Sequence, residues 1–168
     1  MCYRNIEMWR NMHGIIGSEI GLSLIGSNEI LDAVGVVVGI VTKGNKFLVE
    51  RRRRDEAIDP GIVCLPAGHV DPDESLEDAL KREMMEELGI KIKEVQFVCK
   101  NFYVASNGEK QHAYCYMITD YEGEPVCKEA EEIFWEDDIN NMSLDIDKKT
   151  LEKMRKVQSS SDGVHKTG

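Results

Sequence analysis

Two kinds of apolar repeat follow one another along the chain and divide it into strands and helices. Residues 34–41 are almost entirely apolar and β-branched, which predicts a strand buried on both faces. The turn at 43–45 (Lys-Gly-Asn) leads to a second strand over 46–51, paired with the first as a hairpin. After an Asp-Pro-Gly loop at 59–61, a short strand is predicted over 62–65.

A helix follows, and the sequence marks both of its ends. An apolar stripe with a spacing of four faces the core; it consists of Leu76, Leu80, Met84 and Leu88. Ser75 and Asp78 stand in the order of a capping box, and Asp73 is a rival N-cap. Gly89 follows Leu88 in the position of a C-terminal cap, so the helix is predicted to end there.

The remaining segments return to the sheet. Imperfect alternation from Ile90 to Val104 predicts one long strand region, and the turn at 106–108 (Ser-Asn-Gly) reverses the chain. Residues 112–118 are predicted to run back as a strand, with Tyr114 and Tyr116 on one face and Cys115 and Met117 on the other. A short strand over 133–135 and a helix over 147–158 complete the expected elements. Together they predict an α/β fold, a mixed α/β/α sandwich.

Composition and charge limit the partners of this fold. The 168 residues suit one domain, and a net charge of −10 disfavours binding to a nucleic acid polymer or to a membrane. We expect an N-terminal extension over 1–32, the domain over 33–158 and a disordered tail over 159–168. Five cysteines without a C-x-x-C pair indicate reduced thiols and a cytoplasmic location.

The predicted central helix carries a crowd of acidic side chains. At about 100° per residue, Glu83, Glu86 and Glu87 fall on one side of it, with Cβ atoms about 5–6 Å apart. Two unit charges at that separation repel by about 3 kcal/mol at an effective dielectric constant near 20. A solvated acidic face is the simplest explanation for such a run. A hard divalent cation held by oxygen ligands is the functional explanation.

The surrounding pattern favours the cation. It reads G-x5-E-x7-R-E-U-x-E-E-x-G-U, where U is a bulky aliphatic residue. Its positions are Gly68, Glu74, Arg82, Glu83, Met84, Glu86, Glu87, Gly89 and Ile90. The pattern resembles the signature of the Nudix hydrolases, in particular the MutT-like members. The resemblance implies a Nudix α/β/α sandwich with a mixed β-sheet and a catalytic loop–helix–loop. It also implies an enzyme that hydrolyses the pyrophosphate bond of a nucleoside diphosphate linked to another group.

The resemblance also implies roles for individual residues. Mg²⁺ or Mn²⁺ is the expected cofactor, and the expected ligands are Glu83, Glu86, Glu87 and the backbone carbonyl of Gly68. Glu83, Glu86 and Arg82 are expected to be catalytic, with Arg82 bracing the glutamates by ion pairing. Glu74 and Gly89 are expected to be structural or to support the metal ligands from behind. A further carboxylate is expected from a distant loop, as metal ligand or general base; Glu129 is the first choice, with Glu131 and Glu132 as rivals.

The substrate is less constrained. The basic run at 51–54 is either a solvated strand end or a phosphate-recognition site, for which Arg51 and Arg52 are the candidates. The resemblance favours a small-molecule nucleoside triphosphate, oxidised or not. ADP-ribose, a nucleotide sugar and a dinucleotide are the alternatives, and a catalytically silent nucleotide sensor or protein-interaction module is an alternative of another class. A homodimer is left open.

Overall fold

A strand that is apolar on both faces forms the centre of the sheet. The computed structural model describes residues 33–162, and side chains as far as residue 159. Its strands are β1 (Val34–Lys43), β2 (Lys46–Arg51), β3 (Val63–Cys64), β4 (Ala67–His69), β5 (Lys91–Val104), β6 (Lys110–Glu122) and β7 (Glu132–Glu136). Its helices are α2 (Leu76–Leu88), the short 3₁₀ helix η2 (Ile139–Asn141) and α3 (Asp145–Asp162).

The sheet is mixed, as predicted. Its order is β3-β2-β1-β6-β5, with β4 paired to β1 and β7 paired to β2. β1 pairs with β6 in parallel over 34–41, and the other pairings are antiparallel. A parallel neighbour requires a long crossover connection, and the chain between β1 and β6 includes α2.

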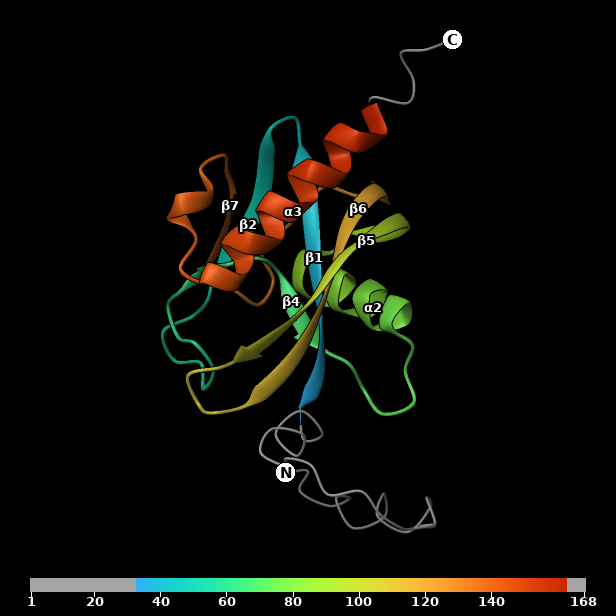
Figure 1. The fold of residues 1–168 in the computed structure, drawn as a ribbon. Coiled ribbons are helices and arrows are strands. Elements are labelled where there is room, and N and C mark those ends of the chain that lie inside the picture. The colour runs from blue at the N-terminus through green and yellow to red at the C-terminus, as the bar shows by residue number, and fades with distance from the viewer. Residues whose placement is uncertain (1–32, 163–168) are drawn as a thin grey trace, which may run out of the picture.

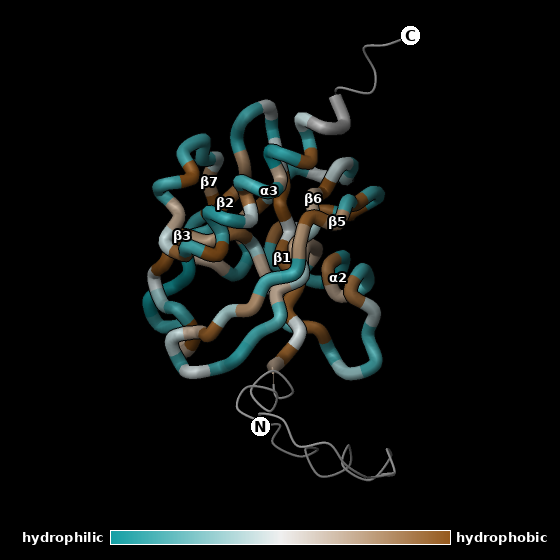
Figure 2. The backbone as a smooth tube through the Cα atoms, viewed as in Figure 1, coloured by the Kyte–Doolittle hydropathy of each residue, from teal (hydrophilic) through white to brown (hydrophobic). Residues whose placement is uncertain are grey.

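Alternate side chains of β1 point into two separate cores. Val36 and Ile40 pack in the core covered by α3, whereas Val37 and Val41 pack in the core covered by α2. Figure 1 shows α3 crossing one face of the strands and α2 lying on the other. In Figure 2 the hydrophobic stretches concentrate on the strands and the hydrophilic stretches on the connecting loops. Burial on both faces explains why β1 reads as a continuous apolar run.

The ends of α2 match the sequence prediction. Ser75 is the N-cap, and its Oγ accepts a hydrogen bond from the Asp78 backbone N–H at 3.1 Å. The rival cap, Asp73, lies in the preceding turn with a φ of 66°. Gly89 ends the helix in the left-handed conformation, and its N–H bonds to the carbonyls of Met84 and Met85.

The β5–β6 hairpin also forms as predicted. Tyr114 and Tyr116 pack in the α2 core, and Cys115 and Met117 pack in the α3 core. β6 extends beyond the predicted strand at both ends, because its N-terminal part pairs with β5 and β1 and its C-terminal part pairs with β5 alone.

Three features differ from the sequence prediction or lie beyond it. β4 was not expected, because three residues with a glycine in the middle carry no strand repeat of their own; the strand is defined by its pairing with β1. α3 continues to Asp162, four residues beyond the predicted boundary at 158. The predicted N-terminal extension and residues 163–168 lie outside the described residues.

Between residues 33 and 162, no helix has the length and apolar character needed to cross a membrane.

The left-handed residue Gly89 provides a test of the packing at the end of α2. A Cβ at this position would lie 3.1 Å from both Lys128 Cε and Val126 Cγ2. Gly108 is also left-handed, with a φ of +86°, but a Cβ there meets nothing within 4 Å. Both substitutions to alanine therefore incur the backbone cost, of about 1 kcal/mol, and only Gly89→Ala adds crowding.

We expect Gly89→Ala to lower the free energy of unfolding by about 1 kcal/mol more than Gly108→Ala does, measured by urea denaturation. Equal losses in the two variants would contradict the packing of the 126–128 loop against this helix end.

Candidate functional site

A cavity of about 690 Å³ brings together half of the site residues singled out from the sequence. It is lined by Gly68 of β4, by Glu83 and Glu87 of α2, and by Glu129 of the loop before β7. Its lining also reaches the first turns of α3, at Asp147 and Thr150. A volume of this size is in the range of small-molecule sites.

Arg82 joins the loop before α2 to the acidic face of the helix. Its guanidinium donates to both carboxylate oxygens of Glu74, at 3.0 and 2.8 Å, and to Glu83 Oε1 at 2.6 Å. It also donates to Glu86 Oε2 at 3.4 Å and to the His69 carbonyl at 2.9 Å. The pKa of Glu74 is lowered by its hydrogen bonds with Arg82. Five acceptors on one guanidinium make Arg82 the brace of this region, as the sequence predicted.

Gly68 and Glu83 are in such close contact that any side chain at position 68 would displace the Glu83 carboxylate. A Cβ at position 68 would lie 1.9 Å from Glu83 Cδ and 2.1 Å from its Oε2. The absence of a side chain therefore lets the carboxylate of Glu83 lie against the backbone of β4. Burial raises the pKa of Glu83, and the hydrogen bond from Arg82 opposes that shift.

Glu87 is a buried carboxylate with an unused oxygen. Among residues 33–162, no group forms a hydrogen bond with its buried Oε2 atom. Burial raises its pKa to about 9, with further contributions from the negative charges of Glu50, Glu83 and Glu129; Arg52 opposes the shift. An unpaired acceptor in such a place is costly unless another group supplies a donor or a positive charge.

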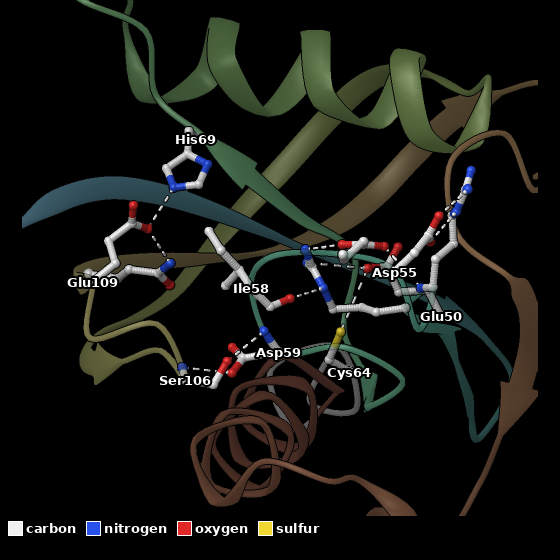
Figure 3. Close-up of polar contacts among 12 residues, drawn as sticks. Glu50, Asp55, Ile58, Asp59, Cys64, His69, Ser106 and Glu109 are labelled. Carbon is white, nitrogen blue, oxygen red and sulfur yellow. Dashed lines mark hydrogen bonds and ion pairs between the residues drawn. The ribbon is translucent and has the colours of Figure 1, made fainter. Parts of the chain in front are cut away.

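Glu50 is a site residue that the sequence reasoning missed. It lies at the end of β2, only 4% exposed, and lines the cavity. Burial raises its pKa to about 7, and Arg52 opposes the shift. The Cys64 thiol donates to Glu50 Oε1 at 3.6 Å (Figure 3). The available signal was a lone acid at the end of an otherwise apolar strand.

The loop that carries Glu129 is fixed to the C-terminal end of α2. Val126 N–H donates to the Leu88 carbonyl at 2.9 Å, and Lys128 N–H donates to the Glu87 carbonyl at 3.1 Å. These bonds use helix carbonyls that have no partner within the helix. They bring Glu129 to the cavity that Glu83 and Glu87 line.

The two rivals of Glu129 lie elsewhere. Glu132 pairs with Arg51 at 2.7 Å, and neither Glu131 nor Glu132 lines the cavity. Glu86 does not line it either; its side chain is 52% exposed and lies next to Arg82. The structure thus brings together Gly68, Glu83, Glu87 and Glu129, with Glu86 at their outer side.

The oxygen atoms of these residues suit a hard divalent cation, although they do not converge on one point in this structure. Among residues 33–162, no three His, Cys, Asp or Glu side chains converge closely enough to hold a metal ion. Arg82 engages Glu83 and Glu86, so their carboxylates are directed at the guanidinium. The unpartnered oxygen of Glu87 and the close approach of Glu83 to the Gly68 backbone nevertheless supply the oxygen ligands that Mg²⁺ and Mn²⁺ prefer.

Of the two candidate arginines, only one lines the cavity. Arg52 lines the cavity; its Nε donates to the Ile58 carbonyl at 3.1 Å, and its guanidinium pairs with Glu56. Arg51 is outside the lining, where it pairs with Glu132 and lies 5.8 Å from the Phe134 ring centroid. Arg53, which was not singled out, also lines the cavity.

A loop anchored at Asp59 forms one wall of the cavity. Asp59 accepts hydrogen bonds from the Ser106 backbone N–H and from the Tyr103 hydroxyl, each at 2.9 Å. Its own N–H donates to Ser106 Oγ at 2.8 Å, so the loop is tied to the β5–β6 turn (Figure 3). No local pattern in the sequence indicates this contact, since Asp59 and Ser106 are separated by 47 positions.

Asp147 is a second buried acid that the sequence reasoning missed. Its Oδ2 accepts a hydrogen bond from the Leu65 backbone N–H at 3.2 Å, and burial raises its pKa to about 7. The folded state therefore keeps a proton up to about pH 7 that the unfolded state loses near the ordinary aspartate pKa of 3.8. The contribution of Asp147 to stability is thus most favourable below pH 4 and declines as the pH rises to 7.

We expect Asp147→Asn to be more stable than the natural chain above pH 7, by roughly 2–4 kcal/mol, with the difference vanishing towards pH 4. Chemical denaturation across this pH range measures it. Asp145→Asn, an exposed position in the first turn of α3, is the matched control and is expected to change stability by less than about 0.5 kcal/mol. A difference independent of pH would contradict the protonated state of Asp147.

Comparison with known proteins finds a matching family model and several relatives. A model of the NUDIX domain matches residues 31–153. An 8-oxo-dGTP diphosphatase of Buchnera aphidicola is 33% identical over 97 residues, 56% of this chain and 70% of the relative. A CTP pyrophosphohydrolase of Escherichia coli is 31% identical over 104 residues, 61% of this chain and 74% of the relative.

Larger proteins match over a shorter stretch. NAD-capped RNA hydrolases, the human protein among them, are 38% identical over 68 residues, and that stretch spans only 14% of their length. Among solved structures, a MutT NUDIX hydrolase from Burkholderia pseudomallei superposes with a TM-score of 0.64 at 26% identity, covering 72% of this chain and 97% of the other. The family model, the mixed sheet and the glutamate-bearing helix agree, and the chain belongs to the NUDIX domain family.

Proposed function

We propose that this chain is a metal-dependent pyrophosphohydrolase that cleaves a nucleoside triphosphate. The observation that supports it best is the contact of Gly68 with the Glu83 carboxylate beside the unpartnered oxygen of Glu87, within one cavity. That arrangement makes sense if a divalent cation is shared between protein oxygens and phosphate oxygens. Glu83, Glu86, Glu87, Glu129 and the Gly68 carbonyl are the proposed ligands of Mg²⁺ or Mn²⁺.

A bound cation would neutralise the phosphate charge and lower the pKa of its bound water. The protein residues hold the proposed ligands and the proton acceptor in position. Arg82 keeps Glu83 and Glu86 in place through its ion pairs, and its bonds to Glu74 hold it in turn. Of Glu83, Glu86 and Glu87, only Glu86 is exposed, so it is the proposed acceptor of the proton from the attacking water, which it can pass to solvent.

The rest of the cavity suits the remainder of a nucleotide. Arg52 and Arg53 place guanidinium groups in its lining, and guanidinium forks suit phosphate oxygens. Asp147, Gln111 and the Tyr103 hydroxyl add hydrogen-bonding groups suited to a base or a sugar. Two relatives are named for nucleoside triphosphates, 8-oxo-dGTP and CTP, which supports this substrate class and leaves the base open.

A capped RNA end is the second candidate substrate. It is favoured by the 38% identity to NAD-capped RNA hydrolases over 68 residues. The net charge of −10 opposes it, because a polymer of phosphates would be repelled by the acidic surface. We also propose a cytoplasmic location, supported by the free thiols of Cys64, Cys99, Cys115 and Cys127.

A substrate panel tests the proposal. The full chain is incubated with 8-oxo-dGTP, dGTP, CTP, ADP-ribose and an NAD-capped oligonucleotide, with Mg²⁺, with Mn²⁺ and with a chelator. The expected result is conversion of at least one nucleoside triphosphate to a monophosphate and pyrophosphate, lost with the chelator. Hydrolysis of the capped oligonucleotide alone would replace the proposal with the second candidate. Absence of turnover on every compound would favour a silent nucleotide sensor.

The role of Glu86 leads to a mutational prediction. We expect Glu86→Gln to lower turnover at least about 100-fold, because the neutral amide neither accepts the proton nor carries the ligand charge. The fold should persist, since the side chain is 52% exposed. Glu77→Gln, an exposed position in the first turn of the same helix, is the matched control and should keep its turnover. Full activity of Glu86→Gln would remove this residue from the chemistry.

A further inference from the structure

Two cysteines lie directly opposite each other on neighbouring strands. Cys99 of β5 and Cys115 of β6 are partners in the antiparallel register, and both side chains belong to the core covered by α3. Both are free thiols. Cys115 also lines the cavity, so the pair adjoins the candidate site without belonging to its acidic cluster.

The two sulfur atoms share the same polar neighbours. Asn101 Nδ2 donates to Cys99 Sγ at 3.4 Å and to Cys115 Sγ at 3.7 Å. Thr150 Oγ1 lies 3.9 Å from the first sulfur and 3.7 Å from the second. Because both thiols are directed at one amide and one hydroxyl, their sulfur atoms face each other.

This environment favours the thiolate of Cys99. Hydrogen bonding with Cys115 lowers the pKa of Cys99 and outweighs its burial; Thr150, Lys153 and Asn101 add to the lowering. Cys64, in contrast, has its pKa raised by burial and by the negative charge of Glu50. Since the thiolate is the reactive form, Cys99 is the more nucleophilic of these two buried cysteines.

The backbone geometry allows a bond between the pair. Directly opposed residues have Cβ atoms about 4.5–5.5 Å apart, and a disulfide requires about 3.5–4.5 Å. A shift of about 1 Å therefore suffices. β5 is at the edge of the sheet, and its register with β6 is irregular between Phe97 and Cys99, so it has room to adjust.

We propose that Cys99 and Cys115 form a site of reversible oxidation, at which a hydroperoxide converts the two thiols into a disulfide. The Cys99 thiolate attacks one oxygen of hydrogen peroxide, the O–O bond breaks, and the departing hydroxide takes a proton to become water. The Cys115 sulfur then attacks the sulfenic sulfur of Cys99, and the hydroxyl group leaves with the Cys115 proton as a second water. Two S–H groups and one peroxide become one S–S bond and two waters.

Oxidation at this site reaches the cavity wall. Cys115 and Thr150 both line the cavity, and the disulfide removes the two S–H groups that contact the Thr150 hydroxyl. The Cys99–Cys115 disulfide does not depend on the proposed function, because it is a covalent state of the chain that is measured without any substrate.

Peptide mapping of the full chain tests it. The folded protein is treated with hydrogen peroxide, unfolded in an alkylating reagent and digested. The expected product is a peptide pair linked through Cys99 and Cys115, lighter by two hydrogens (about 2 Da) and separated by dithiothreitol, while Cys64 remains alkylatable. The proposal is overturned if Cys99 and Cys115 both remain alkylatable after the exposed Cys127 has been oxidised.

Two variants distinguish a reactive pair from two inert core residues. In Cys115→Ser the sulfenic acid of Cys99 has no partner, so a dimedone adduct should accumulate at Cys99 that the natural chain does not retain. Cys127→Ser is the matched control and should form the Cys99–Cys115 disulfide at an unchanged rate. Equal dimedone labelling of Cys99 in the natural chain and in Cys115→Ser would contradict the disulfide step.

Discussion

The ion pairs of Arg82 are the interaction on which the candidate site depends. One guanidinium contacts Glu74, Glu83 and Glu86, and also bonds to the His69 carbonyl. Neighbouring carboxylates on a helix repel by a few kcal/mol per pair when partly sheltered from water, about 3 kcal/mol at an effective dielectric constant of 20. The positive charge of the Arg82 guanidinium offsets part of that repulsion. Arg82 forms no ion pair with Glu87, and one carboxylate oxygen of Glu87 has no partner among the described residues. This uncompensated carboxylate is the physical basis for expecting a bound metal cation in addition to Arg82.

The central strand β1 positions the elements that carry these charged residues. β1 is buried on both faces, so α2 and α3 can pack on opposite sides of one sheet. β4 pairs with β1 and brings the backbone of Gly68 against Glu83, while the loop before β7 is tied to the end of α2 and brings in Glu129. The cavity is therefore assembled from segments that are distant in sequence, and its acids come from α2, α3, β2 and the connecting loops.

The features that the sequence predicted correctly depend on residues that lie close together in the chain. The Ser75 cap and the Gly89 stop depend on residues within or next to one helix, and the structure confirms them. The ion pairs of Arg82 with Glu83 and Glu86 are present, and the catalytic role expected for Arg82 stays a prediction. The sequence could not reveal Asp59 or Asp147, because their contacts are with residues distant in the chain. For Glu50 the only sign was a lone acid at the end of an otherwise apolar strand. Arg51 and Arg52 illustrate the limit: neighbouring residues of an extended chain face opposite ways, and the sequence does not say which one faces the cavity. The Cys99–Cys115 pair likewise requires the register of two strands.

Binding of Mn²⁺ to the nucleotide-free chain, followed by electron paramagnetic resonance, tests the central claim most directly. The account predicts that the natural chain binds Mn²⁺ and that Gly68→Ala weakens binding at least about tenfold, because the added Cβ occupies the place of the Glu83 carboxylate. Ala67→Gly, the neighbouring substitution on the same strand, should bind as the natural chain does. Equal Mn²⁺ affinity in Gly68→Ala and in the natural chain would contradict the account.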